Sequence, residues 1–199
     1  MDMLARYNLR VKKVLLCDMD DVMVNCAMLV RINEHLGTAY QDQDETIPYY
    51  RQEIILDGTE RNKFFTDIFP NMYYYKDVAI KENAREILQK LNEKYELYIV
   101  TDFCIPGHSY LGAKIIPDKF KMLASEFPFL QPEQFVFIRS KKLLTGDIMI
   151  DDKVSNLSPH VSQKLLFTAW HNKKITDKEL FEQGITRVNN WSDIASKLL

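Results

Sequence analysis

The sequence predicts an α/β fold in which a parallel sheet is flanked by helices and a small helical segment is inserted after the first strand. From about residue 78 onward, short apolar runs alternate with segments of helical spacing, which is the pattern of strand–helix–strand units. Before that point, roughly fifty residues that look helical interrupt the alternation. Several apolar runs also end at an acidic or hydroxyl residue, as expected where strand ends line a binding site.

Five short apolar runs predict the strands of the sheet. Each has the length and composition of a strand that is buried in a parallel sheet. In chain order they are Val14–Cys17, Leu97–Val100, Phe135–Ile138, Ile148–Ile150 and Leu165–Ala169.

Apolar residues at helical spacing predict the helices between these strands. One set precedes the strand at Leu97–Val100, and a second precedes the strand at Phe135–Ile138. Only nine residues separate Phe135–Ile138 from Ile148–Ile150, so we expect at most one short helical turn there. Residues 191–199 are predicted to form a closing helix with Ser192 as its N-cap. The two apolar sets are Ala84, Ile87, Leu88, Leu91 and Phe120, Leu123, Ala124, Phe127.

The segment after the first strand is predicted to form a small helical cap. Its candidate helices are Met28–Leu36, Tyr50–Leu56 and Asn62–Phe69, which predicts a core of residues 1–25 and 77–199 and a cap of residues 26–76. An insertion at this point would hang over the carboxyl edge of the sheet. The cap is rich in aromatic residues, most of which we expect to form its own small core: Tyr40, Tyr49, Tyr50, Phe64, Phe65, Phe69, Tyr73, Tyr74 and Tyr75.

Composition and charge are those of an ordinary globular protein. Of the 199 residues, 46% are apolar and 27% are charged, and the formal net charge is −2. A nucleic-acid-binding protein would carry a basic stripe, and a membrane span would need about 18 consecutive apolar residues; the sequence contains neither. Residues 1–13 lack the apolar stretch of a signal peptide. Cys17, Cys26 and Cys104 have no metal-type spacing, and three free thiols fit a reducing cytoplasm.

Acidic, hydroxyl and basic residues occur beside the predicted strands in an order that indicates phosphoryl transfer. Asp18 and Asp20 follow the first strand, Thr101 follows the second, Lys141 precedes the fourth, and Asp151-Asp152 follow the fourth. Carboxylates at one edge of a sheet repel each other unless a cation lies among them, and an oxygen-rich cage suits Mg²⁺. A lysine and a hydroxyl beside this cation would bind a phosphoryl group.

Asp18 and Asp20 supply the two carboxylates that covalent phosphatase catalysis needs. One carboxylate attacks phosphorus, and the other protonates the departing alkoxide. Because the backbone turns after the strand, one can face phosphorus while the other faces the leaving oxygen, and chain geometry alone does not say which is which. Taken singly, such residues are more often exposed strand ends, caps or solvated charges. Their common order along the chain makes that explanation a poor one here.

This order resembles that of the haloacid dehalogenase superfamily of phosphatases and, more narrowly, that of the 5'(3')-deoxyribonucleotidases. The likeness covers nearly the whole chain, and its motifs are specific. The matching segments are Leu15-Leu16-Cys17-Asp18-Met19-Asp20, Arg139-Ser140-Lys141, Gly146-Asp147 to Asp152, Ile150-Asp151-Asp152-Lys153 and Leu166-Phe167-Thr168-Ala169-Trp170-His171-Asn172. The resemblance implies a Rossmann-like core and dephosphorylation of 5'- and 3'-deoxyribonucleoside monophosphates through an aspartyl-phosphate.

The resemblance also implies roles for the residues that match its motifs. Asp18 would be the nucleophile, and Asp20 the general acid and base. Asp18, the Asp20 carbonyl and Asp152 would hold Mg²⁺, while Asp147 and Asp151 would orient these ligands from behind. Thr101, Asp102 and Lys141 would lie at the phosphate, with the adjacent Lys142 as the alternative lysine.

The sequence departs from the family pattern at several positions. Asp21 stands where many relatives have glycine, which adds a negative charge beside the site. Asp102 stands where relatives often have serine, so one side-chain hydrogen bond to phosphate is missing. Tyr74 and Tyr75 replace two phenylalanines, and we expect them in the substrate pocket, where they would stack on a base or wall off the sugar. The resemblance and this wall imply a preference for deoxyribonucleotides over ribonucleotides, with dUMP and dTMP among the best.

Three other functions use similar residues. In a receiver domain the lysine comes last, whereas Lys141 precedes Asp151-Asp152 here. A non-catalytic nucleotide sensor would be favoured by the loss of Asp18 or Asp20, and both are present. A phosphatase for a sugar phosphate or another small monoester stays open, because the fold does not set the substrate. The expected partner is a small nucleoside monophosphate rather than a nucleic acid polymer or a membrane, and a homodimer is left open.

Overall fold

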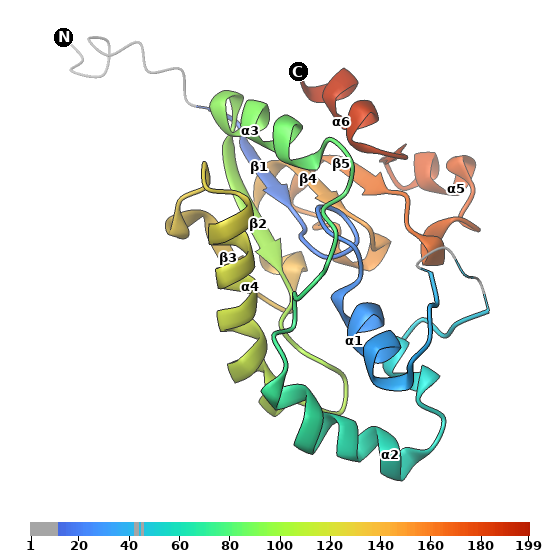
Figure 1. The fold of residues 1–199 in the computed structure, drawn as a ribbon. Coiled ribbons are helices and arrows are strands. Elements are labelled where there is room, and N and C mark those ends of the chain that lie inside the picture. The colour runs from blue at the N-terminus through green and yellow to red at the C-terminus, as the bar shows by residue number, and fades with distance from the viewer. Residues whose placement is uncertain (1–11, 42–43, 45) are drawn as a thin grey trace, which may run out of the picture.

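A computed structural model describes residues 12–41, 44 and 46–199 of the chain, and residues 1–11, for which the sequence predicts no signal peptide, lie outside the described residues. Six parallel strands form one sheet in the order β3-β2-β1-β4-β5-β6, and helices cover it (Figure 1). The strands are β1 (Val14–Cys17), β2 (Glu96–Thr101), β3 (Phe135–Phe137), β4 (Gly146–Asp151), β5 (Val161–Phe167) and β6 (Ile185–Val188).

The buried run of β1 occupies the middle of the sheet. Leu16 pairs with Tyr98 of β2 on one side and with Met149 of β4 on the other. Leu15 and Cys17 are fully buried, as expected for a parallel strand with both faces covered. All five predicted strands are confirmed, although β5 begins at Val161 and ends at Phe167 rather than at Ala169.

One strand and one helix were missed by the sequence analysis. β6 (Ile185–Val188) pairs with β5 at the edge of the sheet, and α5 (Asp177–Glu182) precedes it. Gly184 lies between them with a φ of 68°, a left-handed conformation that glycine adopts without strain. Only Ile185 and Val188 of this strand are buried, so its apolar pattern is too short to predict a strand.

The helices on the sheet are α3 (Ala84–Lys94), α4 (Gly112–Glu126) and α6 (Trp191–Leu198). All four apolar residues that predicted α3 are buried. The predicted N-cap of α6 is wrong, because the Asn190 side chain, not Ser192, accepts a hydrogen bond from the Asp193 backbone N–H at 2.9 Å. Between β3 and β4, residues Lys141–Leu143 form the expected single turn, η7.

The buried face of α4 differs from the predicted one. Phe120 and Ala124 are exposed, while Asp118 and Lys119 are buried together with Ile115, Met122 and Leu123. Phe120 packs instead against Phe135 at the edge of the sheet, with ring centroids 5.4 Å apart. Two charged residues therefore lie on the face where an amphipathic helix usually carries apolar ones.

A helical segment lies between β1 and α3, beyond the carboxyl ends of the strands (Figure 1). It contains α1 (Ala27–Leu36), the short turns η2 (Arg51–Ile54) and η4 (Phe69–Asn71), α2 (Gly58–Lys63) and the π-turn η3 (Phe64–Ile68). The helix predicted over Tyr50–Leu56 is thus only a four-residue turn. Phe64, Phe65 and Phe69 are buried against one another, which confirms an aromatic core in this segment for these three rings.

The chain enters and leaves the helical segment at one place. Val24 forms an antiparallel bridge with Ile80, and the Asn25 backbone N–H donates to the Ala79 carbonyl at 2.9 Å. A core of residues 1–25 and 77–199 with a cap of 26–76 stays a prediction.

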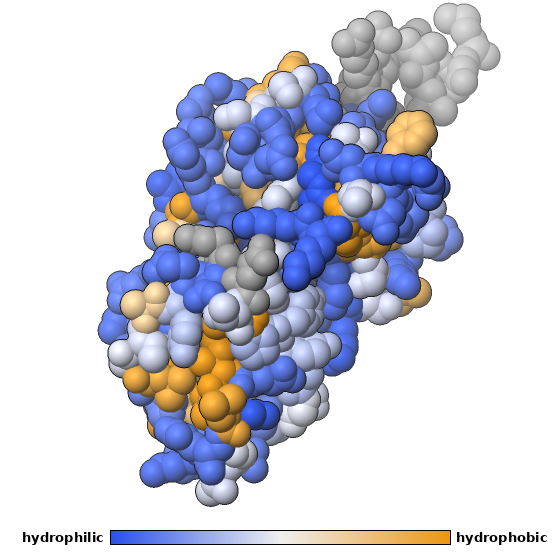
Figure 2. All heavy atoms as spheres, turned by 90° about the vertical axis from the view of Figure 1, so that its right-hand side faces the viewer, coloured by the Kyte–Doolittle hydropathy of each residue, from blue (hydrophilic) through white to orange (hydrophobic). Residues whose placement is uncertain are grey.

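Figure 2 shows a largely polar face on which apolar atoms gather in the lower half. Within the described residues, none of the helices is both long and apolar enough to span a bilayer.

Candidate active site

The sheet order brings the carboxyl ends of β1, β2 and β4 side by side, with β1 in the centre. Asp18 directly follows β1, Thr101 is the last residue of β2, and Asp151 is the last residue of β4. Ligands of open parallel sheets bind outside the carboxyl ends of the strands, near the point where the strand order reverses. Here that point is β1, since β2 and β3 lie on one side of it and β4 to β6 lie on the other.

Lys141 lies among these strand ends, whereas Lys142 does not. The side chain of Lys141 is buried, and its Nζ donates to Asp18 Oδ1 at 2.6 Å and to Asp151 Oδ2 at 2.7 Å. Burial alone would lower the pKa of Lys141, but the charges of Asp151 and Asp18 outweigh it and raise that pKa. Lys142 is exposed on the outer side of the same turn. The turn η7 therefore positions one of the two lysines at the site.

Asp18, Asp151 and Asp152 form a buried acidic cluster, in which one carboxylate oxygen from each lies within 4.8 Å of the others. Burial raises the pKa of Asp18 well above its usual value, an effect that Lys141 partly offsets. Burial and the charge of Asp151 raise the pKa of Asp152 to about 7. A divalent cation would relieve this cost of burying carboxylates, and an all-oxygen donor set is the kind that Mg²⁺ prefers. These three residues are therefore able to hold such an ion.

Hydrogen bonds fix the second acidic pair in place. Asp151 Oδ1 accepts from the Lys153 backbone N–H at 2.9 Å and from the Asn156 amide at 3.1 Å. Asp152 Oδ2 lies 2.6 Å from Nε2 of His171, and the Asp152 carbonyl accepts from the Asn172 amide at 2.7 Å. The segment after β5 thus supports the end of β4.

Asp20 lies on the pocket side of the cluster and has partners of its own. Its Oδ1 accepts a hydrogen bond from the Tyr75 hydroxyl at 2.7 Å, and its Oδ2 pairs with the Lys119 ammonium. The same ammonium donates to Thr101 Oγ1 at 2.6 Å. Lys119 therefore links the end of β2 to the turn after β1.

The structure does not bring Asp147 to the site. Asp147 is the second residue of β4, at the opposite end of the strand from Asp151, and its Oδ2 accepts from the Val14 backbone N–H at 2.8 Å. Four residues of parallel strand separate these positions by about 13 Å. Asp147 therefore ties the amino ends of β1 and β4 together and cannot orient the ligands of a metal ion at the carboxyl ends.

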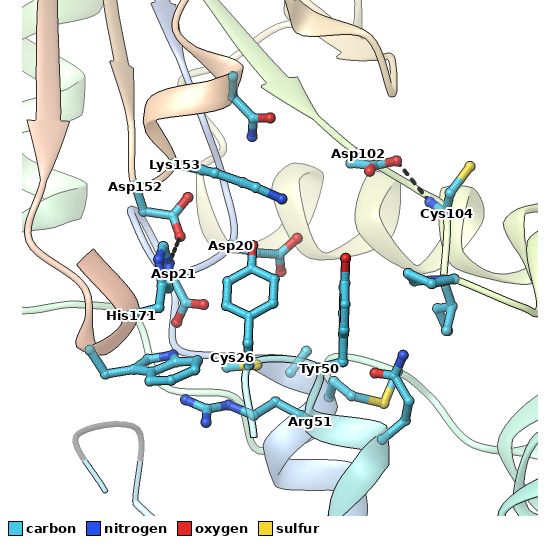
Figure 3. A pocket seen from close by; sticks show the side chains of 18 of the residues that line it. Asp20, Asp21, Cys26, Tyr50, Arg51, Asp102, Cys104, Asp152, Lys153 and His171 are labelled. Atoms are coloured by element: carbon cyan, nitrogen blue, oxygen red, sulfur yellow. Dashed lines mark hydrogen bonds and ion pairs between the residues drawn. The ribbon is translucent and has the colours of Figure 1, made fainter. Parts of the chain in front are cut away.

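A pocket of about 410 Å³ opens over the acidic edge, between the strand ends and the helical segment. In Figure 3, Asp20, Asp152 and Lys153 reach into it from the sheet, and Tyr50 faces them from the helical segment. Tyr74 lines the pocket, but Tyr75 does not, because its hydroxyl is turned to Asp20. Its remaining lining includes Asp21, Arg51, Asp102, Cys104, Ile105, Arg139, Asn156, Trp170 and His171.

Asp21 and Asp102, the two acidic residues that depart from the family pattern, both line this pocket. Asp21 adopts a φ of 60°, the left-handed conformation that a glycine would favour. The Asp102 carboxylate accepts from the Cys104 backbone N–H at 2.9 Å, so it shapes the loop after β2 (Figure 3). A carboxylate cannot donate a hydrogen bond to phosphate, so only the backbone of Asp102 is able to do so.

Comparisons with known proteins agree with this architecture. Residues 12–199 match the family described as 5' nucleotidase, deoxy (pyrimidine), cytosolic type C protein. The chain belongs to this family. It is 28% identical over 193 residues to a 5'(3')-deoxyribonucleotidase of Bacillus subtilis, a match that covers 95% of this chain and all of the relative. A Staphylococcus aureus protein provisionally named as a 5'(3')-deoxyribonucleotidase is 31% identical over 140 residues, 70% of this chain and 71% of that protein.

A solved structure shows the same fold. A Burkholderia xenovorans protein, provisionally described as a haloacid dehalogenase-like hydrolase, aligns over 94% of this chain and 96% of its own with a TM-score of 0.50 and 15% identity. The Rossmann-like core expected from the sequence is therefore confirmed. As a member of the deoxynucleotidase family, the chain is a phosphoric monoester hydrolase.

Two residues of this hydrolase were missed by the sequence analysis. Lys119 lies on α4, far along the chain from every motif, and only its place in an apolar stripe with Ile115 and Met122 indicates burial. His171 lies in a segment that resembles the family, but no strand end or metal-type spacing singles it out.

Aromatic and basic side chains join the helical segment to the sheet at one side of the pocket. The Arg51 guanidinium lies over the Trp170 ring, 3.7 Å from its centroid. The Tyr49 ring lies 5.2 Å from the His171 ring, and the Lys153 ammonium lies 5.1 Å from the Tyr49 centroid. These contacts give the pocket a wall of rings beside the acidic cluster.

Proposed function

We propose that this protein is a Mg²⁺-dependent phosphatase that removes phosphate from 5'- and 3'-deoxyribonucleoside monophosphates through an aspartyl-phosphate at Asp18. The observation that carries the proposal is a convergence at one sheet edge. Lys141 pairs with Asp18 and Asp151, and oxygens of Asp18, Asp151 and Asp152 lie within 4.8 Å of one another. Membership of the deoxynucleotidase family supports the choice of substrate.

In this proposal Asp18 and Asp20 act in two steps. A carboxylate oxygen of Asp18 attacks phosphorus, the bond to the ester oxygen breaks, and Asp20 gives that oxygen its proton. Asp20 then takes a proton from water, the water oxygen attacks phosphorus, and inorganic phosphate leaves Asp18 in its original form. The exposure of Asp20 to the pocket and the ion pair between Asp18 and Lys141 support this division of roles.

Three further groups would stabilise the charge on the phosphoryl oxygens. Lys141 brings a positive charge beside Asp18, and the Thr101 hydroxyl can donate a hydrogen bond. Mg²⁺, held by Asp18, Asp152 and the Asp20 carbonyl, would shield the attacking carboxylate from the phosphate charge. Lys141 also offsets the charge of Asp151, which holds the loop after β4 in place.

The pocket supports a nucleoside as the leaving group. Tyr50, Tyr74 and Trp170 line it, and aromatic faces of this kind stack on a base. An apolar wall near the sugar would leave a ribose 2'-hydroxyl unpaired, at a cost of about 1–3 kcal/mol. We therefore propose the deoxy preference, with dUMP and dTMP as good substrates, residues 26–76 as a cap over the site, and the cytoplasm as the location. A homodimer stays a prediction.

A panel of phosphomonoesters tests this function. The purified protein should hydrolyse dUMP and dTMP with a kcat/KM at least about tenfold above that for UMP. This ratio corresponds to the lower part of the energy range for leaving the 2'-hydroxyl of UMP without a hydrogen-bond partner. Equal efficiency toward UMP and dUMP would remove the deoxy preference. Activity toward a sugar phosphate and no nucleotide would replace the proposed substrate class.

The metal requirement is measured in the same assay. Chelator-treated protein should be inactive, and added Mg²⁺ should restore the activity, because the buried carboxylates of Asp18 and Asp152 otherwise face the phosphate without compensation. Calcium should bind without supporting much turnover, since its larger coordination shell changes the attack geometry. Undiminished hydrolysis after chelation would rule out the metal.

A further inference from the structure

We propose that Lys119 and Tyr75 are positioning residues that hold Asp20 ready for proton transfer to the leaving group and aim the Thr101 hydroxyl at the phosphoryl group. This inference rests on the proposed function, since it concerns how Asp20 serves that reaction. Tyr75 contacts Asp20, and Lys119 contacts both Asp20 and Thr101, so both would act through these two side chains.

Lys119 is buried, and the contacts that the described part of the chain gives its ammonium are with groups at the site. Its side chain is 2% exposed, and its ammonium contacts Asp20 Oδ2, Thr101 Oγ1 and the Tyr75 ring, whose centroid is 5.7 Å away. Moving a lysine out of water is costly, and the ion pair regains that cost only with good geometry. A lysine at this position of α4 therefore stabilises one arrangement of the turn after β1 against the end of β2.

The contact with Lys119 determines what the Thr101 hydroxyl can do. An ammonium has three donors and no acceptor, so Thr101 Oγ1 must accept from it. The hydroxyl hydrogen is then left to donate. Within the described residues its acceptor is the Asp102 carbonyl at 3.4 Å, which is a long distance for an O–H···O bond. A phosphoryl oxygen in the pocket would be a better acceptor.

Tyr75 holds the other oxygen of Asp20. Its hydroxyl donates to Oδ1 at 2.7 Å and Lys119 pairs with Oδ2, so the carboxylate plane is fixed from two sides. Each oxygen keeps a second lone pair, which can hold the proton that Asp20 passes to the leaving group. A phenylalanine at this position would keep the ring but would have no hydroxyl to donate.

One turn of α4 fixes both residues. Asp118, directly before Lys119, accepts a hydrogen bond from the Tyr74 backbone N–H at 2.9 Å and pairs with Lys114. The backbone of Tyr74 is therefore held by the same turn that supplies Lys119, and Tyr75 follows it immediately. The two donors to Asp20 consequently come from segments that are tied to each other.

A leaving-group series tests the proposal. The variants are Tyr75→Phe, which carries the residue of the family pattern and should fold, and Lys119→Met. The substrates are dUMP, phenyl phosphate and p-nitrophenyl phosphate. In this order the leaving oxygen becomes more stable as an anion and depends less on receiving a proton. The matched controls are Tyr73→Phe and Lys121→Met, neighbours of the two residues that do not contact Asp20. Melting temperatures are recorded for every variant.

Positioning predicts losses that grow as the leaving group worsens. General acid catalysis contributes about 10²–10⁴-fold, so Lys119→Met should lower kcat on dUMP by on the order of 10²-fold and on p-nitrophenyl phosphate by about tenfold or less. Tyr75→Phe should lose about tenfold on dUMP, the value of one hydrogen bond, and little on p-nitrophenyl phosphate. Both effects should appear in kcat rather than in KM, and the controls should behave like the wild-type protein.

The outcomes separate this inference from the proposed function. Equal losses on all three substrates would overturn the role toward Asp20, and no loss in either variant would overturn both roles. A wild-type protein that hydrolyses both aryl phosphates but no deoxyribonucleotide would overturn the proposed substrate instead. The comparison between phenyl and p-nitrophenyl phosphate would then still decide the role of Lys119 and Tyr75.

Discussion

Lys141 and Lys142 are neighbours in one short turn, yet their environments differ completely. Lys141 is buried between Asp18 and Asp151, and Lys142 is exposed. A three-residue turn points successive side chains in different directions, so an alignment error of one residue would move the charge away from the site. The difference in burial makes the two lysines a matched pair for experiment.

Lys141→Met keeps the stem of the side chain and removes its charge. We expect the rate of hydrolysis to fall by on the order of 10²-fold or more, as for the loss of one preorganised charge-stabilising donor. The melting temperature should fall as well, because breaking a buried ion pair costs about 3–5 kcal/mol. Steady-state kinetics below the melting temperature, with Lys142→Met as the control, checks both effects. Loss of activity in Lys142→Met but not in Lys141→Met would show that Lys142, rather than Lys141, contacts the phosphate.

At the scale of elements, α6 depends on a cap that lies one residue before the helix. The Asn190 side chain satisfies the Asp193 backbone N–H, which has no partner within the helix. Asn190→Ala should lower the free energy of unfolding by about 1 kcal/mol, which is a shift of about 2–4 °C in melting temperature for a chain of this size. Ser192→Ala, the control, should change the melting temperature by much less. A larger effect at Ser192 would restore the cap expected from the sequence.

The loop after β2 contacts the helical segment through His108, whose ring stacks on Phe65 with centroids 4.1 Å apart. Burial, with a smaller contribution from the charge of Arg61, lowers the pKa of His108 below its usual value of 6.5. The folded state therefore takes up this proton less readily than the unfolded state. The stability that neutral His108 contributes is present above pH 6.5 and is lost as the pH falls through the lowered pKa.

Urea unfolding at several pH values checks this sign. His108→Gln, which cannot titrate, should lose less stability than the wild-type protein between about pH 7 and pH 5, while His160→Gln, at an exposed position, should follow the wild-type slope. Only the slopes are compared, since the loss of the stack on Phe65 lowers stability at every pH. A wild-type slope in the His108 variant would show that this ring does not carry the pH dependence.

Across the sheet, the residues that were correctly predicted to come together lie at strand ends. Asp18, Thr101 and Asp151 come together because each follows a buried apolar run, and the carboxyl ends of parallel strands share one edge. Lys119 could not be found in this way. It reaches the site from the middle of α4, and helix periodicity predicts which residues are buried but not what a buried lysine contacts.

The predictions that failed have physical reasons of the same kind. Asp147 precedes Asp151 by only four residues in the sequence. A strand rises about 3.3 Å per residue, so Asp147 lies at the opposite end of β4 from the site. Phe120 was placed in the core by its apolar side chain, whereas the charged Asp118 and Lys119 occupy that face because Tyr74 and Asp20 satisfy them. The spacing of apolar residues therefore does not predict the buried face of a helix when distant residues pair with its buried charges.

In the proposed reaction, Asp18 attacks phosphorus and carries the phosphoryl group. Its position directly after β1, within 2.6 Å of the Lys141 ammonium, is the basis of that role. Asp18→Asn removes the attacking carboxylate and should abolish turnover while the protein stays folded, but loss of activity alone does not show which atom attacked.

The stereochemical course at phosphorus shows whether the phosphoryl group passes through Asp18. A deoxyribonucleotide whose phosphoryl group is made chiral by three oxygen isotopes is turned over in the presence of an alcohol that competes with water as the acceptor. Each in-line displacement inverts the configuration, so transfer through an aspartyl-phosphate predicts net retention in the alkyl phosphate product. Net inversion would mean that the acceptor attacks the nucleotide directly and that Asp18 is not the nucleophile.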